Sequence, residues 1–577
     1  MKYLKRYARR YARESVLAPL FKMLEAFFDL LVPMIVARII NVGIAAGDKQ
    51  YILGQCLILV GMAVMGLLCS FTAQYFAARA AVGTAAGLRR DLYARVNEMP
   101  CAVLDRVGAS TLITRLTSDI SLVQNGINMF LRLFLRSPFI VFGAVIMALR
   151  IDTRIGLVFL TGVAVLSGIV AVIMKKTAPM YRDIQGDLDG VTRTARENLT
   201  GVRVVRAFGR EENEKQAFGA ENAALFRAQN LAGRVSALMN PLTYATVNLC
   251  VIAILYMGGG AVDRGAMSSG SVVALVNYMG QILVELVKLA NLIVLVSRAG
   301  AGLSRVAQVM DIDVSVPTVP AGDAAGDAAG DAGEAVAFEH VSMAYGGGDN
   351  SIEDVSFTAR RGETVGVIGS TGSGKSTLVN LIPRLYDAAS GTVRLFGRDV
   401  RSIPPEELRR LVAVVPQKSR LFRGTVRSNL RWGRPDAGED EMWEALRMAQ
   451  AEDFVRAKDG GLDAPVEQGG RNLSGGQRQR LTIARALLAG ARVLILDDAS
   501  SALDYATDLK LRQALATLKD TTVFLVSQRT GSLRDADRIL VMDDGRLVGE
   551  GGHRELLDSC PVYREIHESQ YRKGEDA

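Results

Sequence analysis

The first 310 residues alternate between long apolar runs and stretches rich in lysine and arginine. A helix needs roughly 20 apolar residues to cross the hydrocarbon core of a bilayer, about 30 Å. Residues 51–78 contain no charged side chain and are the clearest example. The third run is uncharged only over residues 137–149, and Arg132 and Arg136 lie just before that part. The pattern predicts a transmembrane domain over residues 1–310 with six helices, at about 16–46, 51–82, 128–149, 155–176, 235–262 and 265–297.

The basic side chains between these runs are unevenly distributed. The connections between the second and third spans and between the fourth and fifth are long and basic, whereas the others are short. Lysine and arginine are retained on the cytoplasmic side, so the long connections and the N-terminus are expected there. An even number of spans then leaves the rest of the chain in the cytoplasm. We expect a multi-pass protein of the plasma membrane.

The two long connections have a mostly helical pattern, so the membrane helices are expected to extend well beyond the bilayer. Each connection contains a short break, at residues 104–109 and 209–212. Such a break between long helices can lie across the surface of another domain. A plain solvated turn is the alternative, and the pattern alone leaves both open.

Several charged side chains fall inside the predicted spans, among them Asp29 and Glu285. Charges within a membrane are costly, so each is a candidate functional residue. The functional hypothesis is that Asp29 or Glu285 faces a substrate cavity and attracts cationic amphiphiles. The alternative is an ion pair within the membrane, or a side chain that extends toward its surface.

The pattern changes after the sixth span. Residues 311–335 contain Pro317, Pro320 and a Gly-Asp-Ala-Ala repeat, a composition that cannot bury a core and is typical of a flexible linker. A soluble α/β domain is predicted from residue 336 to 577.

Composition narrows the range of partners. Of 577 residues, 49% are apolar, which is unusual for a soluble enzyme and indicates a membrane portion. The formal net charge of +8 could indicate nucleic-acid binding, but six spans with cytoplasmic cations account for it, so no nucleic-acid partner is expected. The five cysteines are scattered without metal-ligand spacing and are expected to be packing residues.

A glycine-rich segment follows a short apolar strand at residues 364–368 and precedes a helix. It matches the phosphate-loop spacing G-x-x-x-x-G-K-[ST]. Its members are Gly369, Ser370, Thr371, Gly372, Ser373, Gly374, Lys375 and Ser376, with Thr377 next. Backbone N–H groups of such a loop face an anion, Lys375 can reach the β- and γ-phosphates, and Ser376 can bind Mg²⁺. The segment predicts a site for ATP and Mg²⁺. The expected fold class is a six-helix all-α transmembrane domain fused to an α/β P-loop nucleotide-binding domain.

Two further segments fit such a site. An apolar strand at residues 493–497 ends in Asp497, which is expected to bind Mg²⁺ together with Ser376. A second turn at a helix N-terminus is another candidate anion cradle. It contains Ser474, Gly475, Gly476 and Gln477. One ATP does not need two cradles from one chain, so the second is expected to cover a nucleotide held by another subunit.

These motifs, in this order, resemble those of the ABC transporter family, specifically exporter half-transporters with six membrane helices fused to a nucleotide-binding domain. The resemblance covers essentially the whole chain, and the LSGGQ run is its most specific part. It implies that Tyr345 stacks on adenine, that Gln417 contacts Mg²⁺ and senses the membrane domain, and that Asp504 lies in a loop crossing the dimer interface. It also implies that the breaks near Asp105 and Arg210 are coupling helices.

Two positions depart from the family pattern. Members that hydrolyse ATP efficiently have glutamate directly after the strand aspartate and histidine after a later strand, whereas this chain has Asp498 and Gln528. Shortening the carboxylate by one methylene moves it by about 1 Å or more, and a misplaced general base costs about 10²–10⁴-fold in rate. Gln528 can donate a hydrogen bond to a γ-phosphate but carries no charge. We expect this chain's own site to bind ATP and to hydrolyse it slowly or not at all.

The LSGGQ turn, by contrast, is intact, and this leads to a heterodimer hypothesis. In the head-to-tail dimer of the family, each site joins one chain's phosphate loop to the other chain's LSGGQ. This chain would complete a competent site on a second half-transporter that supplies the Glu and His. The implied function is ATP-driven export of amphiphilic drugs or lipids by alternating access. The alternatives are a homodimeric exporter or lipid flippase with slow ATPase activity, and a non-transporting regulatory membrane ATPase.

Overall fold

The computed structural model describes residues 2–314, 333–345, 348 and 350–571. The chain divides into two compact units. The first comprises Met1–Asn97 and Ser110–Ile312, and the second comprises Glu98–Ala109 and Asp313–Ala577. Most of the expected linker, residues 315–332, lies outside the described residues.

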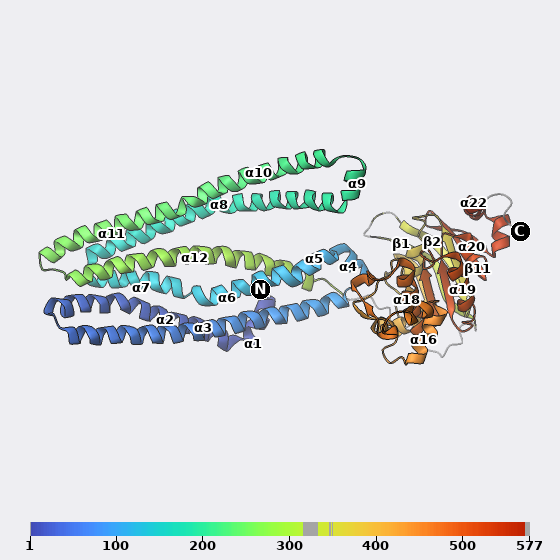
Figure 1. The fold of residues 1–577 in the computed structure, drawn as a ribbon, viewed down its shortest axis with the longest axis horizontal. Helices are drawn as coiled ribbons and strands as arrows, with labels where there is room; N and C mark the ends of the chain where they lie inside the picture. The colour runs from blue at the N-terminus through green and yellow to red at the C-terminus, as the bar shows by residue number, and fades with distance from the viewer. Residues whose placement is uncertain (1, 315–332, 346–347, 349, 572–577) are drawn as a thin grey trace. The chain divides into compact units, whose positions relative to one another are not determined.

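The first unit is a bundle of long helices that run side by side (Figure 1). Among the described residues, six helical segments are long and apolar enough to cross a membrane. They are Ala12–Ile44, Lys49–Glu98, Ala109–Ile151, Thr153–Thr200, Glu211–Asp263 and Ser269–Met310. The helices of this unit are α1 (Lys2–Arg10), α2 (Ala12–Arg38), α3 (Lys49–Glu98), α5 (Ala109–Thr114), α6 (Ile120–Leu133), α7 (Arg136–Ile151), α8 (Thr153–Thr200), α9 (Val202–Ala207), α10 (Glu211–Ala237), α11 (Met239–Asp263) and α12 (Ser269–Met310), with π-helical turns η1 (Ile39–Ile44) and η2 (Arg115–Asp119).

Several of these helices are longer than a bilayer requires. Helix α3 has 50 residues and α8 has 48. At 1.5 Å per residue they reach about 70–75 Å, more than twice the hydrocarbon thickness of about 30 Å. Their basic ends therefore extend beyond the bilayer, as the sequence pattern indicates.

The third span is built from two helices. Helix α6 ends at Leu133 and α7 begins at Arg136. Pro138 lies in the first turn of α7, where its missing N–H costs no intrahelical hydrogen bond. The helix expected at residues 128–149 therefore contains a break, because proline favours a new helix start at this point.

The centre of the first unit lies among α2, α7, α8 and α12. Tyr278 of α12 is fully buried, and its hydroxyl donates to the Leu30 carbonyl oxygen of α2 at 2.6 Å. Ala26, Ala144 and Ala274 are also fully buried. Small side chains at such positions let helices approach closely, which is how helices pack where no hydrophobic effect drives them together.

A short helix overlaps the first expected break, at residues 104–109, and another ends just before the second, at residues 209–212. Helix α4 (Cys101–Val107) is followed by Gly108 at φ 79°, and α9 is followed two residues later by Gly209 at φ 60°. Both glycines have a positive φ, which glycine adopts at low cost because it has no Cβ. Helix α4 clusters with the second unit, so the domain division differs from the single boundary near residue 310 drawn from sequence.

The second unit is built on a six-stranded sheet with the order β12-β11-β3-β10-β9-β6. All neighbours except β11 and β12 are parallel. The strands are β3 (Thr364–Gly369), β6 (Val412–Val415), β9 (Val493–Asp497), β10 (Thr522–Val526), β11 (Arg538–Asp543) and β12 (Arg546–Gly551). Every residue of β9 and β10 is buried, as expected for parallel strands covered on both faces. The carboxyl ends of β3, β9 and β10 consequently meet at one edge, where the functional loops leave the sheet.

A second sheet and a set of short helices complete this unit. The sheet has four strands in the order β2-β1-β4-β5. Its strands are β1 (Glu334–Ala344), β2 (Asn350–Arg360), β4 (Ser390–Leu395) and β5 (Arg398–Asp399), and a separate pair joins β7 (Gly424–Thr425) to β8 (Pro465–Val466). The helices are α13 (Lys375–Leu381), α14 (Pro405–Leu411), α15 (Val426–Leu430), α16 (Glu439–Met448), α17 (Glu452–Arg456), α18 (Gly475–Leu488), α19 (Tyr505–Leu515), α20 (Thr530–Leu533), α21 (His553–Ser559) and α22 (Pro561–Gln570).

Candidate nucleotide-binding site

The phosphate loop connects β3 to α13 at the carboxyl edge of the six-stranded sheet. Two of its glycines are required by space as well as by backbone conformation. A Cβ at Gly369 would lie 2.1 Å from the Met542 carbonyl oxygen, and one at Gly374 would lie 2.6 Å from the Ser351 carbonyl oxygen. Gly374 also has φ 92°. The loop can therefore curl tightly only with glycine at these positions.

Lys375, the first residue of α13, is held within the loop. Its ammonium donates to the carbonyl oxygens of Gly369 at 2.9 Å and Ser370 at 2.5 Å, and to Ser373 Oγ at 3.2 Å. The pKa of Lys375 is lowered, because burial disfavours the charged ammonium more than the nearby charges of Asp497 and Asp498 favour it. The ammonium is thus placed where a phosphate would replace loop carbonyls as its partner.

Ser376 and Asp497, two of the three expected Mg²⁺ ligands, lie together, and the third is Gln417. The Ser376 hydroxyl donates to Asp497 Oδ1 at 2.9 Å. Burial, with the neighbouring Asp498 charge, raises the pKa of Asp497, and the Ser376 hydrogen bond opposes this. A bound divalent cation would favour the ionised carboxylate. A hydroxyl, a carboxylate, phosphate oxygens and water form the usual coordination set of Mg²⁺, so these residues fit the ion.

Asp498 follows Asp497 in a strained turn. It has φ 48°, and its N–H donates to the Val526 carbonyl oxygen of β10 at 3.1 Å. Its Oδ2 lies 3.4 Å from Gln417 Nε2. The structure therefore brings together Asp498 and Gln417, which the sequence separates by 81 positions.

Gln528 lies at the same edge of the sheet. In the parallel pairing of β9 and β10, Val526 is the partner of Asp497, so Gln528 emerges beside the two aspartates. The Gln528 residue is exposed, and its carbonyl oxygen accepts a hydrogen bond from Gln570 Nε2 at 2.7 Å. The sequence predicts that Gln528 contacts the γ-phosphate, but no sequence signal predicts its contact with Gln570.

Tyr345 lies next to the phosphate-loop helix. Its hydroxyl donates to Thr377 Oγ1 at 3.3 Å, and its residue is 44% exposed. The ring of Tyr386 meets it edge-on, with 5.1 Å between centroids. An exposed ring beside the loop can stack on an adenine base. Sequence reasoning did not identify Tyr386, because no motif marks it.

The LSGGQ turn forms the N-terminus of α18. Ser474 Oγ accepts from the Gln477 N–H at 3.2 Å, and the Ser474 N–H donates to Gln477 Oε1 at 3.0 Å. This reciprocal capping box fixes the turn while Ser474 and Gly475 stay exposed. Asp504, also exposed, caps α19 by accepting from the Thr507 N–H and hydroxyl, and these hydrogen bonds lower the pKa of Asp504.

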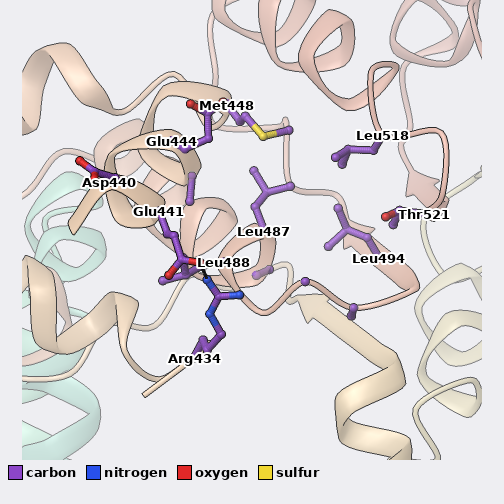
Figure 2. A pocket seen from close by; sticks show the side chains of 14 residues that line it. Arg434, Asp440, Glu441, Glu444, Met448, Leu487, Leu488, Leu494, Leu518 and Thr521 are labelled. Atoms are coloured by element: carbon purple, nitrogen blue, oxygen red, sulfur yellow. Dashed lines mark ion pairs between the residues drawn. The ribbon is translucent and has the colours of Figure 1, made fainter. Parts of the chain in front are cut away.

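A cavity of about 500 Å³ lies elsewhere in this unit, between α16 and α18 (Figure 2). Its lining includes Met448, Leu487 and Leu494, and Arg434 is paired with Glu441 at its edge. None of the side chains expected to bind ATP or Mg²⁺ lines it. The nucleotide site is therefore the open cradle at the strand ends.

Comparison with known families matches residues 15–286 to the ABC transporter transmembrane region and residues 352–501 to the ABC transporter domain. An uncharacterized ABC transporter ATP-binding protein of Mycobacterium tuberculosis is 36% identical over 98% of this chain and 97% of its own length.

The chain belongs to the ABC transporter family.

Other relatives also match nearly the whole length of this ABC transporter. YfiB of Bacillus subtilis, an uncharacterized ABC transporter ATP-binding protein, is 32% identical over 99% of each chain. A multidrug efflux ATP-binding/permease protein of Mycobacterium bovis is 31% identical over 97% of this chain and 46% of its own length. A solved bacterial Atm1-family ABC exporter with ATP bound shares the fold, with a TM-score of 0.79 and 21% identity over 98% of this chain and 99% of that one.

These findings confirm the family resemblance and the fold class expected from sequence. This ABC transporter carries a membrane domain and an ATP-binding domain in one chain, so it is a multi-pass membrane protein whose ATPase is coupled to transport. A half-transporter of this fold acts as a dimer in a lipid bilayer.

Six of the charged side chains within the spans of this ABC transporter form one network. Arg136 lies 2.9 Å from Asp29 Oδ2 and 2.5 Å from Glu285 Oε1, and so links α2, α7 and α12. Glu285 is buried, and its other oxygen accepts from Ser137 Oγ at 2.7 Å. Lys288 also contacts Glu285, at 2.9 Å. Asp29, by contrast, has a side chain that is 44% exposed.

A cavity of about 240 Å³ adjoins this network and is lined by Asp29, Arg136, Gln281 and Glu285, among others. The network extends to Lys22 and Glu25, which pair at 2.5 Å. Three cations and three anions are thus grouped together, so the formal charge of the network is balanced. Asp29 is the acidic residue that the cavity leaves most accessible, because Glu285 is enclosed by its partners.

Proposed function

We propose that this chain is one half of a heterodimeric ABC exporter that moves amphiphilic drugs or lipids out across the plasma membrane. Its own ATP site hydrolyses slowly, and its nucleotide-binding domain lies in the cytoplasm. Family membership and fold support ATP-driven export. The relative named as a multidrug efflux protein supports an amphiphilic substrate.

The observation that carries the proposal is the contrast between two parts of the nucleotide-binding domain. The binding parts are complete, because Lys375 lies in the loop and Ser376 contacts Asp497. The hydrolytic parts are altered, because the residue near Gln417 is the short carboxylate of Asp498. A carboxylate that does not reach its water lowers the rate of hydrolysis without weakening ATP binding.

The exposed LSGGQ turn supports the role of a partner. Its backbone is fixed by the capping box, and Ser474 and Gly475 remain open at the positive end of the α18 dipole. In a head-to-tail dimer this turn would cover the ATP held by the second half-transporter. The second chain would supply the Glu and His that this chain lacks.

The residues of this chain then act as follows. Gly369, Gly374 and the α13 N-terminus bind the phosphates, and Lys375 contacts the β- and γ-phosphates. Ser376 and Asp497 would hold Mg²⁺, which would neutralise charge on the transferring phosphate. ATP favours the closed pair of nucleotide domains, so binding alone shifts the equilibrium between inward- and outward-facing states. Hydrolysis at the partner's site resets it.

We assign substrate contact in the membrane to Asp29 in preference to Glu285. Glu285 is enclosed by Arg136, Ser137 and Lys288, so removing its charge would disturb the helix bundle itself. Asp29 is accessible from the adjoining cavity and could pair with a cationic group of an amphiphile without losing Arg136.

The test compares the purified chain alone with its complex with a second half-transporter, in lipid nanodiscs. We expect slow ATP hydrolysis by the lone chain, faster hydrolysis by the complex, and ATP-dependent dye or lipid transport by the complex in proteoliposomes. Rapid turnover by the lone chain that Asp498→Asn abolishes would refute the heterodimer. Transport by the lone chain would identify a slow homodimeric exporter or flippase, and ATP binding without any transport would identify a regulatory ATPase.

A further inference from the structure

The loop that carries Gln528 is contacted by the C-terminal helix of the described chain. We call residues 528–531 the switch loop; it follows β10 and includes the first two residues of α20 (Thr530–Leu533). Helix α22 packs against α20, β3 and β11, and Figure 1 shows α22 and α20 close together near the C-terminus. The end of α22 therefore lies on the same segment that presents Gln528.

One side-chain amide spans the switch loop. Gln570 Nε2 donates to the Gln528 carbonyl oxygen at 2.7 Å. Gln570 Oε1 accepts from the Thr530 N–H at 3.0 Å and from the Thr530 hydroxyl at 3.3 Å. Both ends of the planar amide are thus used, one on each side of Arg529, so the amide fixes the path of the backbone between them.

Two neighbouring residues at the end of α22 reinforce this contact. His567 Nδ1 lies 3.0 Å from Thr530 Oγ1. A Cβ at Gly531 would lie 2.4 Å from the Tyr571 hydroxyl, so this ring lies directly against the loop. His567 and Gln570 are three residues apart on α22, the spacing that places side chains on one helix face, and Tyr571 directly follows the helix.

The helix that holds the loop is itself well anchored. Tyr563 of α22 is fully buried, and its hydroxyl lies 2.7 Å from His553 Nδ1 of α21. Leu556 and Cys560 are buried in the same core. A firm base of this kind lets one exposed glutamine define the position of a loop.

We propose that Gln570 is a positioning residue of the ATP site, which holds the backbone of Gln528 so that its side chain faces the γ-phosphate. This inference deepens the proposed function, because it rests on Gln528 contacting the γ-phosphate. Gln528 is an exposed side chain with several rotatable bonds, so its direction depends on its main chain being fixed. Because the amide of Gln528 carries no charge, unlike a protonated histidine, its contact with the γ-phosphate depends mainly on how the side chain is directed.

The alternative role of Gln570 is only to fasten α22 to the domain. The two roles differ in what they predict for nucleotide selectivity. A fastening residue would change stability and leave the preference for ATP over ADP unaltered. A positioning residue would change that preference, and would do so only while the Gln528 side chain is present.

The experiment measures the affinities of the full-length chain for ATP and ADP by displacement of a fluorescent ATP analogue. Gln570→Ala and Gln570→Glu are compared with Ser569→Ala, an exposed neighbour whose hydroxyl donates to the Ile566 carbonyl oxygen of its own helix. We expect the ATP preference to fall about 3- to 10-fold in both Gln570 variants, the effect of one or two lost hydrogen bonds. Ser569→Ala should leave it unchanged. Gln570→Glu keeps an acceptor for Thr530 and so retains the fold if Gln570→Ala unfolds.

A double-mutant cycle decides whether Gln570 acts through Gln528. In a Gln528→Ala background, Gln570→Ala should cause no further loss of ATP preference. The same loss in both backgrounds, or an unchanged preference in the single Gln570 variants, would overturn the proposal. The heterodimer proposal is judged separately, by the ATP turnover of the lone chain, so failure of one is distinguishable from failure of the other.

Discussion

Restoring the longer carboxylate at position 498 should restore part of the missing hydrolysis. The change is Asp498→Glu, alone and combined with Gln528→His. The present carboxylate lies within 3.4 Å of Gln417, so the added methylene, about 1.5 Å, extends it past that contact. It is then long enough to reach a water aligned with the γ-phosphate.

Two effects of this change oppose each other. A misplaced general base costs about 10²–10⁴-fold, so partial repair should raise the rate of this site by about 10- to 100-fold. The backbone at position 498 has φ 48°, which aspartate tolerates better than glutamate. The strain should cost roughly 1 kcal/mol of stability. The repaired chain is therefore expected to be faster and slightly less stable.

The assay isolates this site within the heterodimer. The partner's catalytic glutamate is replaced by glutamine, and phosphate release is measured in nanodiscs together with the thermal unfolding midpoint. Asp498→Asn is the matched control and should lower the residual rate. If the double variant folds and binds ATP normally but its rate rises less than twofold, the short carboxylate is not what limits hydrolysis.

Three other predictions follow from named contacts. Gly374→Ala should weaken ATP binding at least 10-fold in a fluorescent-nucleotide titration, because its Cβ would meet the Ser351 carbonyl oxygen. Gly372→Ala, whose Cβ would lie in open space, should lose less ATP affinity, and equal losses would contradict the steric argument. Tyr386→Phe removes the 2.5 Å hydrogen bond to Asp105 of α4 but keeps the ring beside Tyr345. Tryptic cleavage at Arg106 should therefore become several-fold faster, while ATP affinity changes less than twofold. Unchanged cleavage would show that the hydrogen bond does not hold α4. Glu285→Gln should destabilise the membrane domain by about 2–3 kcal/mol, which is less than the cost of a fully unpaired buried charge because Asp29 still faces Arg136. Asp29→Asn should leave the unfolding midpoint nearly unchanged and lower the transport of cationic dyes. A larger loss of stability in Asp29→Asn, with dye transport lowered only in Glu285→Gln, would refute the assignment of substrate contact to Asp29.

The amino-acid sequence by itself determined the features that depend on local pattern. Six apolar runs predict six spans because a bilayer demands a fixed length of apolar helix. The phosphate loop and the LSGGQ turn are marked by contiguous residues, since glycine conformation and helix capping are short-range effects. The parallel strands that end in Asp497 and before Gln528 were evident from their continuous apolar runs.

Only the tertiary structure decided which distant residues meet. Gln570 reaches Gln528 across 42 positions, and Tyr386 reaches Asp105 across 281, and no local signal marks either pair. Arg136 was known to carry a charge, but its sharing between Asp29 and Glu285 depends on how three helices pack. That packing also separates an enclosed glutamate from an accessible aspartate, which a sequence shows as two equivalent acids. The physical reason is that burial and hydrogen-bond geometry are properties of the assembled helices and strands, whereas local pattern specifies each element alone.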